Sequence, residues 1–107
     1  MTHVLEETNV IVKKIADYCK PIKIILFGSV SRDQYTVESD IDLLIIKNTE
    51  KKRSLRVKEV FEAVRGIKRE YPLDPIVYTQ EELDHRLLLG DYFIKSIMDH
   101  GKIVYGK

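Results

Sequence analysis

Two short apolar runs, separated by a short polar segment, constrain the fold of this chain more than any other feature. Residues 22–27 and 41–46 consist mainly of isoleucine and leucine and are bounded by proline, glycine and polar residues, a pattern typical of buried β-strands. Ten residues, 30–39, separate Ser29 from Asp40. That gap is shorter than the roughly twelve residues that a parallel crossover needs, so the two strands are predicted to pair antiparallel.

Two carboxylates stand at the start of the second predicted strand. Asp40 and Asp42 flank Ile41, and the alternation of a strand places both acids on one face while Ile41 points into the core. Neighbouring carboxylates repel each other unless a cation lies between them. Because hard oxygen ligands select Mg²⁺ or Mn²⁺ over zinc, the pair predicts a divalent metal site.

A glycine and a serine follow the first predicted strand. Gly28 and Ser29 precede a short helical turn at residues 30–32. Such a turn offers backbone N–H groups, a hydroxyl and a helix N-terminus to an anion. Since antiparallel pairing brings this turn opposite Asp40, we expect a phosphate site beside the metal site, at one edge of the sheet.

These motifs resemble the signature of the DNA polymerase beta-like nucleotidyltransferase superfamily, and most closely its small members, the minimal nucleotidyltransferases. The signature is an apolar strand, Gly-Ser, a spacer of this length and Asp-apolar-Asp, which here is Gly28-Ser29 and Asp40-Ile41-Asp42. The resemblance covers nearly the whole chain. It implies an α/β (α+β) fold with a small mixed sheet, in which the first two strands are antiparallel, the second and third are parallel, and helices flank the sheet.

The resemblance also implies a third carboxylate on a later strand, and Asp74 occupies that place. Small members commonly carry an arginine three residues after the serine, which Arg32 matches, followed by a glycine. Asp33 replaces that glycine, a departure that concerns the loop rather than the metal ligands. Asp33 and Glu38 are interpreted as charged loop residues, although the position of Glu38 would also allow it to approach a metal ion.

The activity implied by the resemblance is transfer of a nucleoside monophosphate, with ATP as the expected donor, to a hydroxyl. Two Mg²⁺ ions, or Mn²⁺, would be held by the catalytic residues Asp40, Asp42 and Asp74. The phosphates would be bound by Gly28, Ser29 and Arg32. A serine hydrolase is disfavoured because no G-x-S-x-G elbow surrounds Ser29; His3, His85 and His100 are interpreted as surface or helix-end residues.

The remaining segments are predicted to alternate between helices and strands. An amphipathic helix covers 2–20, and Pro75 favours an edge position for the third strand. The later elements expected are a helix capped by Ser54 with Val57, Val60, Phe61 and Val64 as its apolar stripe, a strand at 75–79, a helix at 80–89, a helix from an Asp91 cap to His100, and a strand at 103–105.

Length and composition are those of one small domain, expected to span 1–107. The net charge of +1 provides no overall field that favours direct binding to nucleic acid. Cys19 is the one cysteine, which excludes an internal disulfide and suits a reducing, cytoplasmic environment. No apolar run is long enough to cross a membrane, so membrane association is not expected.

The acceptor is expected to come from another chain, because larger relatives hold it on appended domains that this length does not accommodate. Small relatives are often antitoxins that adenylylate a tyrosine of an all-helical HEPN-type toxin, and the resemblance implies that partner here. Two alternatives remain open. One is a binding module that neutralises a partner by contact alone. The other is an enzyme that works as a homo-oligomer, specifically a dimer, and transfers the nucleotide to an antibiotic.

Overall fold

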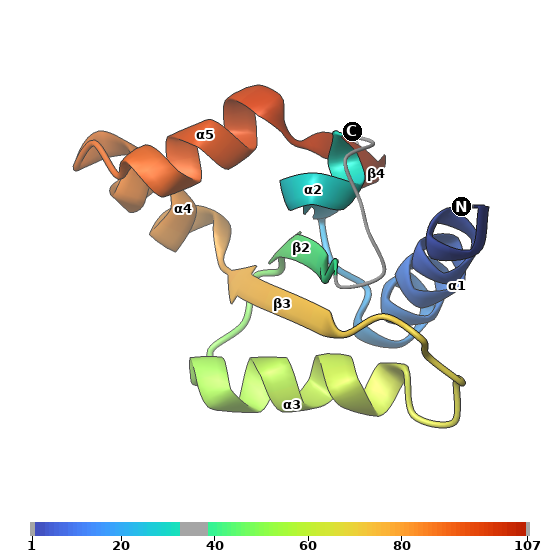
Figure 1. The fold of residues 1–107 in the computed structure, drawn as a ribbon. Helices are drawn as coiled ribbons and strands as arrows, with labels where there is room; N and C mark the ends of the chain where they lie inside the picture. Colours follow the sequence, from blue (N-terminus) through green and yellow to red (C-terminus); the bar gives the residue numbers. More distant parts are fainter. Residues whose placement is uncertain (1, 33–38, 107) are drawn as a thin grey trace.

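The computed structural model describes residues 2–32 and 39–106. Figure 1 shows the elements in chain order: α1 (Thr2–Cys19), β1 (Lys23–Phe27), α2 (Gly28–Ser31), β2 (Ile41–Ile46), α3 (Arg53–Ala63), β3 (Leu73–Tyr78), α4 (Gln80–Leu88), α5 (Tyr92–His100) and β4 (Lys102–Tyr105). Within the described residues, no helix combines the length and apolar character needed to span a membrane.

The four strands form one mixed sheet in the order β3-β2-β1-β4. β1 and β2 pair antiparallel, with Lys23 opposite Ile46 and Phe27 opposite Asp42. β2 and β3 pair parallel, and β4 adds to the free side of β1 in the antiparallel sense. The predicted mixed α/β fold is therefore confirmed.

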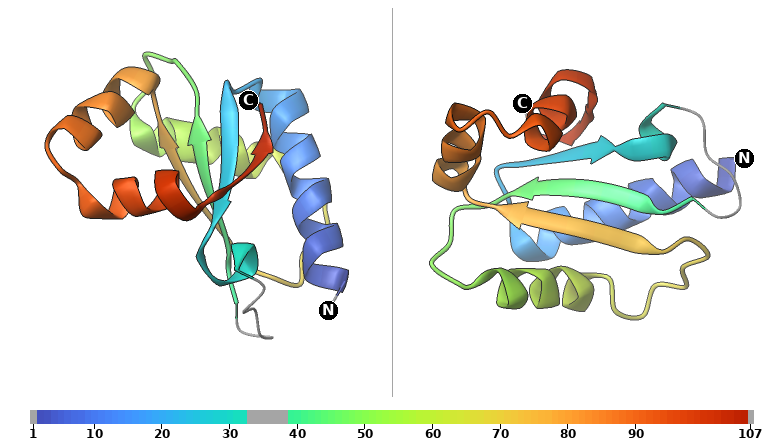
Figure 2. Two further views of the ribbon diagram at one scale, coloured as in Figure 1. Left: turned by 90° about the horizontal axis from the view of Figure 1, so that it is seen from above. Right: turned by 60° about the vertical axis from the view of Figure 1, so that its left-hand side comes forward.

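The alternating side chains of the sheet pack into two layers of core. Leu43 and Ile45 of β2 contribute to the layer under α1 and α3, whereas Leu44 and Ile46 contribute to the layer under α4 and α5. Figure 2 shows these helix pairs on opposite faces of the sheet. Because both faces are covered, β2 is apolar at almost every position, and its exception is Asp42.

The start of β3 differs from the prediction by two residues. The parallel ladder begins at the pair Ile41–Leu73, so β3 starts at Leu73 rather than at Pro75, and Asp74 lies inside the strand. β3 is the edge of the sheet, which confirms the position predicted from Pro75. A proline has no N–H to donate, and the outer side of an edge strand needs no donor.

The predicted cap of α3 was wrong. The helix begins at Arg53 with Lys52 as N-cap, because the backbone N–H groups of Leu55 and Arg56 both donate to the Lys52 carbonyl. Ser54 therefore lies within the first turn. Phe61, predicted in the apolar stripe, is instead on the exposed side of the helix.

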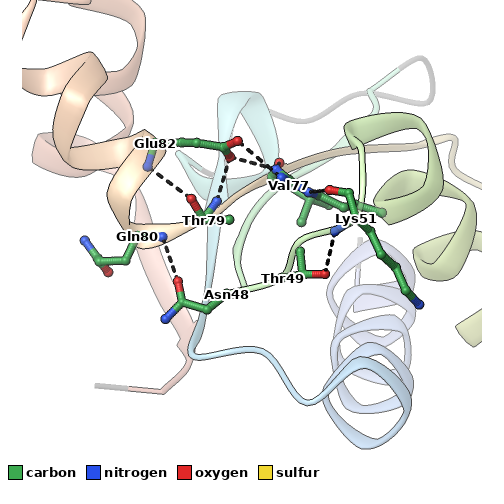
Figure 3. A network of polar contacts seen from close by, with 8 residues as sticks. Asn48, Thr49, Lys51, Val77, Thr79, Gln80 and Glu82 are labelled. Carbon is green, nitrogen blue, oxygen red and sulfur yellow. Dashed lines mark hydrogen bonds and ion pairs between the residues drawn. The ribbon is translucent and has the colours of Figure 1, made fainter.

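A polar network fixes α3 and α4 to β3 (Figure 3). Arg56 is 7% exposed and forms a two-pronged ion pair with Glu82, whose side chain is 35% exposed. The Arg56 guanidinium also donates to the Val77 carbonyl and to the Lys51 carbonyl. Glu82 in turn completes a capping box with Thr79 at the start of α4. The N-terminus of α3 is thus fixed by Arg56 rather than by a capping hydroxyl.

Candidate functional site

β1, β2 and β3 lie side by side in the sheet at the position of the predicted site residues. Asp42 of β2 pairs with Phe27 of β1 on one side and with Asp74 of β3 on the other. By alternation, Asp42 lies on the same face as Leu44, which is the face covered by α5. The parallel register thus brings together two acids that are far apart in the sequence.

The Asp42 carboxyl has an unusual electrostatic environment. Burial, followed by the charges of Asp74 and Asp40 and a side-chain hydrogen bond with Asp74, raises its pKa to about 6. All four effects favour the protonated acid. Asp40 and Asp74 are themselves exposed, and Asp40 stands one residue before β2. Asp42 is therefore a carboxyl that gains from a nearby cation.

The backbone at Gly28 packs directly against Asp42. Gly28 has a φ of +78°, and a Cβ on this residue would overlap the Oδ2 and Cγ atoms of the Asp42 side chain. The left-handed conformation favours glycine, and a side chain at this position would displace the Asp42 carboxylate. The turn after β1 therefore lies directly beside the Asp42 carboxylate.

Serine hydroxyls tie the turn to its surroundings. α2 begins at Gly28 itself, two residues earlier than the predicted turn. The Ser29 hydroxyl donates to the Ser39 hydroxyl at 3.1 Å, which links the turn to the residue before Asp40. The Ser31 hydroxyl donates to the Gly28 carbonyl at 2.8 Å.

A cavity of about 400 Å³ opens at this place. Four of the predicted site residues line it, namely Gly28, Arg32, Asp42 and Asp74. Ser29 and Asp40, the other two predicted site residues, are not among the lining residues. Asp33 and Glu38 lie outside the described residues.

One wall of the cavity was missed by the sequence reasoning. Phe93, Ser96, Ile97 and His100 of α5 line it, and their three- and four-residue spacing is that of a single helix face. His100 is exposed at the end of α5, as predicted, but it also faces this cavity. The spacing was visible in the sequence, whereas the surface that α5 covers was not.

The acidic side chains at the cavity are oxygen donors of the kind that bind a divalent cation. Across residues 2–32 and 39–106, no three acidic, histidine or cysteine side chains already converge as a metal cluster. Asp42 and Asp74 nevertheless offer adjacent carboxylate oxygens, and burial, followed by the charge of Asp74, raises the pKa of Asp42. Hard oxygen ligands that repel one another in this way fit Mg²⁺ or Mn²⁺.

The comparison with protein families decides the assignment. The sequence model described as "Nucleotidyltransferase domain" matches residues 9–104, which include all six predicted site residues. The chain belongs to the nucleotidyltransferase domain family. This membership confirms the superfamily resemblance, while the minimal subgroup stays a prediction. Gly28, Asp42 and Asp74, three of the predicted site residues, are brought together by β1, β2 and β3 within the matched range.

A solved structure shares the nucleotidyltransferase fold. It is a crystal structure of a Sulfolobus solfataricus protein provisionally described as a nucleotidyltransferase, with a TM-score of 0.66 and 22% identity. The match covers 99% of this chain and 83% of that chain. At this level of identity the likeness is one of fold. No curated protein matches the sequence of this nucleotidyltransferase domain.

Proposed function

We propose that this protein, as one domain spanning 1–107, transfers a nucleoside monophosphate from a nucleoside triphosphate, ATP first among them, to a hydroxyl of an acceptor. The observation that carries the proposal is the close packing of the Gly28 turn against Asp42, with Asp74 level beside it. A phosphate-binding turn and a carboxylate pair in contact are what nucleotidyl transfer requires.

Asp40, Asp42 and Asp74 would hold two Mg²⁺ ions, which Mn²⁺ can replace. When bound, these ions neutralise the triphosphate and polarise its α-phosphorus for in-line attack. Their charge also keeps the Asp42 carboxyl ionised at neutral pH, because a nearby cation lowers a pKa that like charges have raised.

Phosphate binding is assigned to the turn after β1. The backbone N–H groups of Gly28 and Ser29, with the Ser29 hydroxyl, bind the β and γ phosphates. Arg32, whose side chain lines the cavity, neutralises charge on the departing pyrophosphate. Each of these contacts strengthens as negative charge moves onto the leaving group.

Asp74 is the proposed proton acceptor. It is exposed and lies on the edge strand β3, so an acceptor can approach it from outside the sheet. The acceptor oxygen forms a bond to the α-phosphorus, the bond from that phosphorus to the bridging oxygen breaks, and pyrophosphate leaves. The hydroxyl proton passes to the Asp74 carboxylate.

The acceptor is proposed to be a tyrosine of a HEPN-type partner. Leu88, Leu89 and Tyr92 form an apolar corner between α4 and α5, and they are 83%, 70% and 83% exposed. An apolar surface of this kind is typical of a protein contact. The corner lies at the start of α5, the helix whose Phe93, Ser96, Ile97 and His100 line the cavity, so a partner docked on it would lie on the same helix as the site.

The test uses α-labelled ATP, Mg²⁺ and the protein encoded by the neighbouring gene, which we expect to be of the HEPN type. Label and the mass of one nucleoside monophosphate should appear on a partner tyrosine with the wild type, and Asp42→Asn should abolish both while keeping the wild-type circular dichroism spectrum. Undiminished transfer by Asp42→Asn, or none by the wild type, rejects the proposal.

The same assay separates the two alternative functions. If an Asp40→Asn/Asp42→Asn variant still neutralises the partner, contact alone is sufficient. If label moves to an added antibiotic and sedimentation shows a dimer, the acceptor is a small molecule. Under the proposal, neutralisation requires both acids and the label appears on protein.

A further inference from the structure

The cavity has an apolar half that neither the metal site nor the phosphate turn uses. Phe27 and Ile76 of the sheet line it together with Phe93 and Ile97 of α5. Phe27 directly precedes Gly28 and is level with Asp42. The apolar half therefore begins where the phosphate-binding half ends.

Packing of the core does not account for the position of the Phe93 side chain. Ile94 and Ile97 of the same helix are buried in the core layer over the sheet, whereas the Phe93 side chain is 54% exposed. Its ring meets the Phe27 ring edge to face, with the centroids 5.9 Å apart and the planes at 83°. This contact holds an exposed aromatic ring in a defined orientation at the cavity.

We propose that Phe93, held by Phe27, is the surface on which the nucleobase of the triphosphate stacks. The inference rests on the proposed function and extends it by assigning the base-binding part of the same site. A flat aromatic ring beside a phosphate turn suits a nucleobase because every base presents a π-face. A cavity of about 400 Å³ is within the range of small-molecule sites.

A contact between Phe93 and the partner protein is the competing explanation for its exposure. Two observations favour the nucleobase. Phe93 lines the cavity together with Asp42 and Arg32, and the neighbouring Tyr92, which is more exposed, does not line it. The two adjacent aromatic residues thus belong to different surfaces.

The experiment compares two ligands, Mg²⁺–ATP and inorganic tripolyphosphate with Mg²⁺, by calorimetric titration in the absence of any partner. Phe93→Ala should weaken ATP binding about 5- to 100-fold, the range that loss of one stacked base corresponds to. Its affinity for tripolyphosphate should stay unchanged, since that ligand has no base. Phe93→Tyr should restore ATP binding.

Tyr18→Ala is the matched control, because Tyr18 is also an aromatic residue on a helix surface, 59% exposed, and lies on α1 across the sheet. It should bind both ligands as the wild type does. If Phe93→Ala binds ATP with wild-type affinity, the proposed stacking of the nucleobase on Phe93 is wrong. If that variant also fails to transfer the nucleotide to the partner, Phe93 belongs to the contact with the partner protein. An equal loss of both ligands also overturns the stacking. A wild type that binds neither ligand rejects the proposed function itself.

Discussion

Gly28 and Asp42 are packed so closely that residue 28 cannot carry a side chain without displacing the carboxylate. The contact joins the turn after β1 to the start of β2. A substitution at either residue should therefore alter both the conformation of the phosphate-binding turn and the position of the carboxylate pair.

Gly28→Ala should abolish the binding of Mg²⁺–ATP and destabilise the fold. Its matched control is Gly90→Ala, because Gly90 has the same φ of +78° but nothing within 4 Å of its Cβ position. Both variants should lose about 1–2 kcal/mol through positive-φ strain, and Gly28→Ala should lose more. Urea denaturation and calorimetry measure the two effects; wild-type ATP affinity in Gly28→Ala would contradict the assignment.

Asp42→Asn should stabilise the metal-free protein, increasingly so as the pH rises. The folded-state pKa of Asp42 is raised to about 6 from 3.8, so the folded chain holds this proton more tightly than the unfolded chain. Its contribution to the free energy of unfolding is highest below pH 4 and is lost between about pH 4 and pH 6. Denaturation in EDTA at pH 4 and pH 7.5 checks this. An equal effect of the substitution at both values would count against it.

Mg²⁺ should raise the thermal midpoint of the wild type and leave that of Asp42→Asn unchanged. At ten times its dissociation constant, a ligand that binds only the folded state adds about 1.4 kcal/mol. Because metal binding needs the ionised carboxyl, the affinity should fall below pH 6. Thermal melts at several Mg²⁺ concentrations measure both trends. Identical midpoint shifts in the two proteins would remove Asp42 from the metal ligands.

Glu7 holds the segment that precedes Asp74. Its carboxylate accepts hydrogen bonds from the backbone N–H groups of Glu70 and Tyr71 at 2.7 and 2.9 Å. Glu7→Ala should cost about 1–2 kcal/mol of stability and weaken Mg²⁺ binding by displacing Asp74. The exposed neighbour Glu6 provides the control, and Glu6→Ala should change neither quantity. Unchanged Mg²⁺ affinity in Glu7→Ala would limit Glu7 to a purely structural role.

Glu82→Gln should destabilise the protein at neutral pH by about 2 kcal/mol. This loss is smaller than that expected from removing one partner of a fully buried ion pair, because Glu82 is partly exposed. Hydrogen bonding from Arg56, together with the Thr79 backbone, lowers the pKa of Glu82 to about 2. This contribution is present above pH 4.5 and is lost as the pH falls toward 2. The difference from wild type should therefore shrink at pH 3. Glu81→Gln, on the exposed neighbour, should show no such pH dependence.

Local features of the sequence were sufficient for much of the site. The short spacer predicted the antiparallel pairing of β1 and β2, because the length of a connection is a local property of the chain. The alternation around Ile41 placed Asp42 on the face opposite Ile41, but that face is also covered by helices, and Asp42 lies at the end of a second core layer. The capping role of Asp91 was predicted because a cap also depends on neighbours in the chain, and its side chain accepts from the Ile94 N–H. The cap at Ser54 was predicted wrongly, because the distant partner Glu82 places Arg56 and thereby the start of α3.

The sequence by itself determined the identity of the strands, the glycine turn and the acids, since backbone conformation and side-chain alternation act over a few residues. Only the tertiary structure decided that Asp74 stands level with Asp42, that Glu7 holds the loop segment before β3, and that Phe93 and His100 of α5 line the cavity. These relationships join residues that lie far apart in the chain. They arise because the sheet register and the burial of two apolar layers minimise the free energy of the whole domain rather than of any one segment.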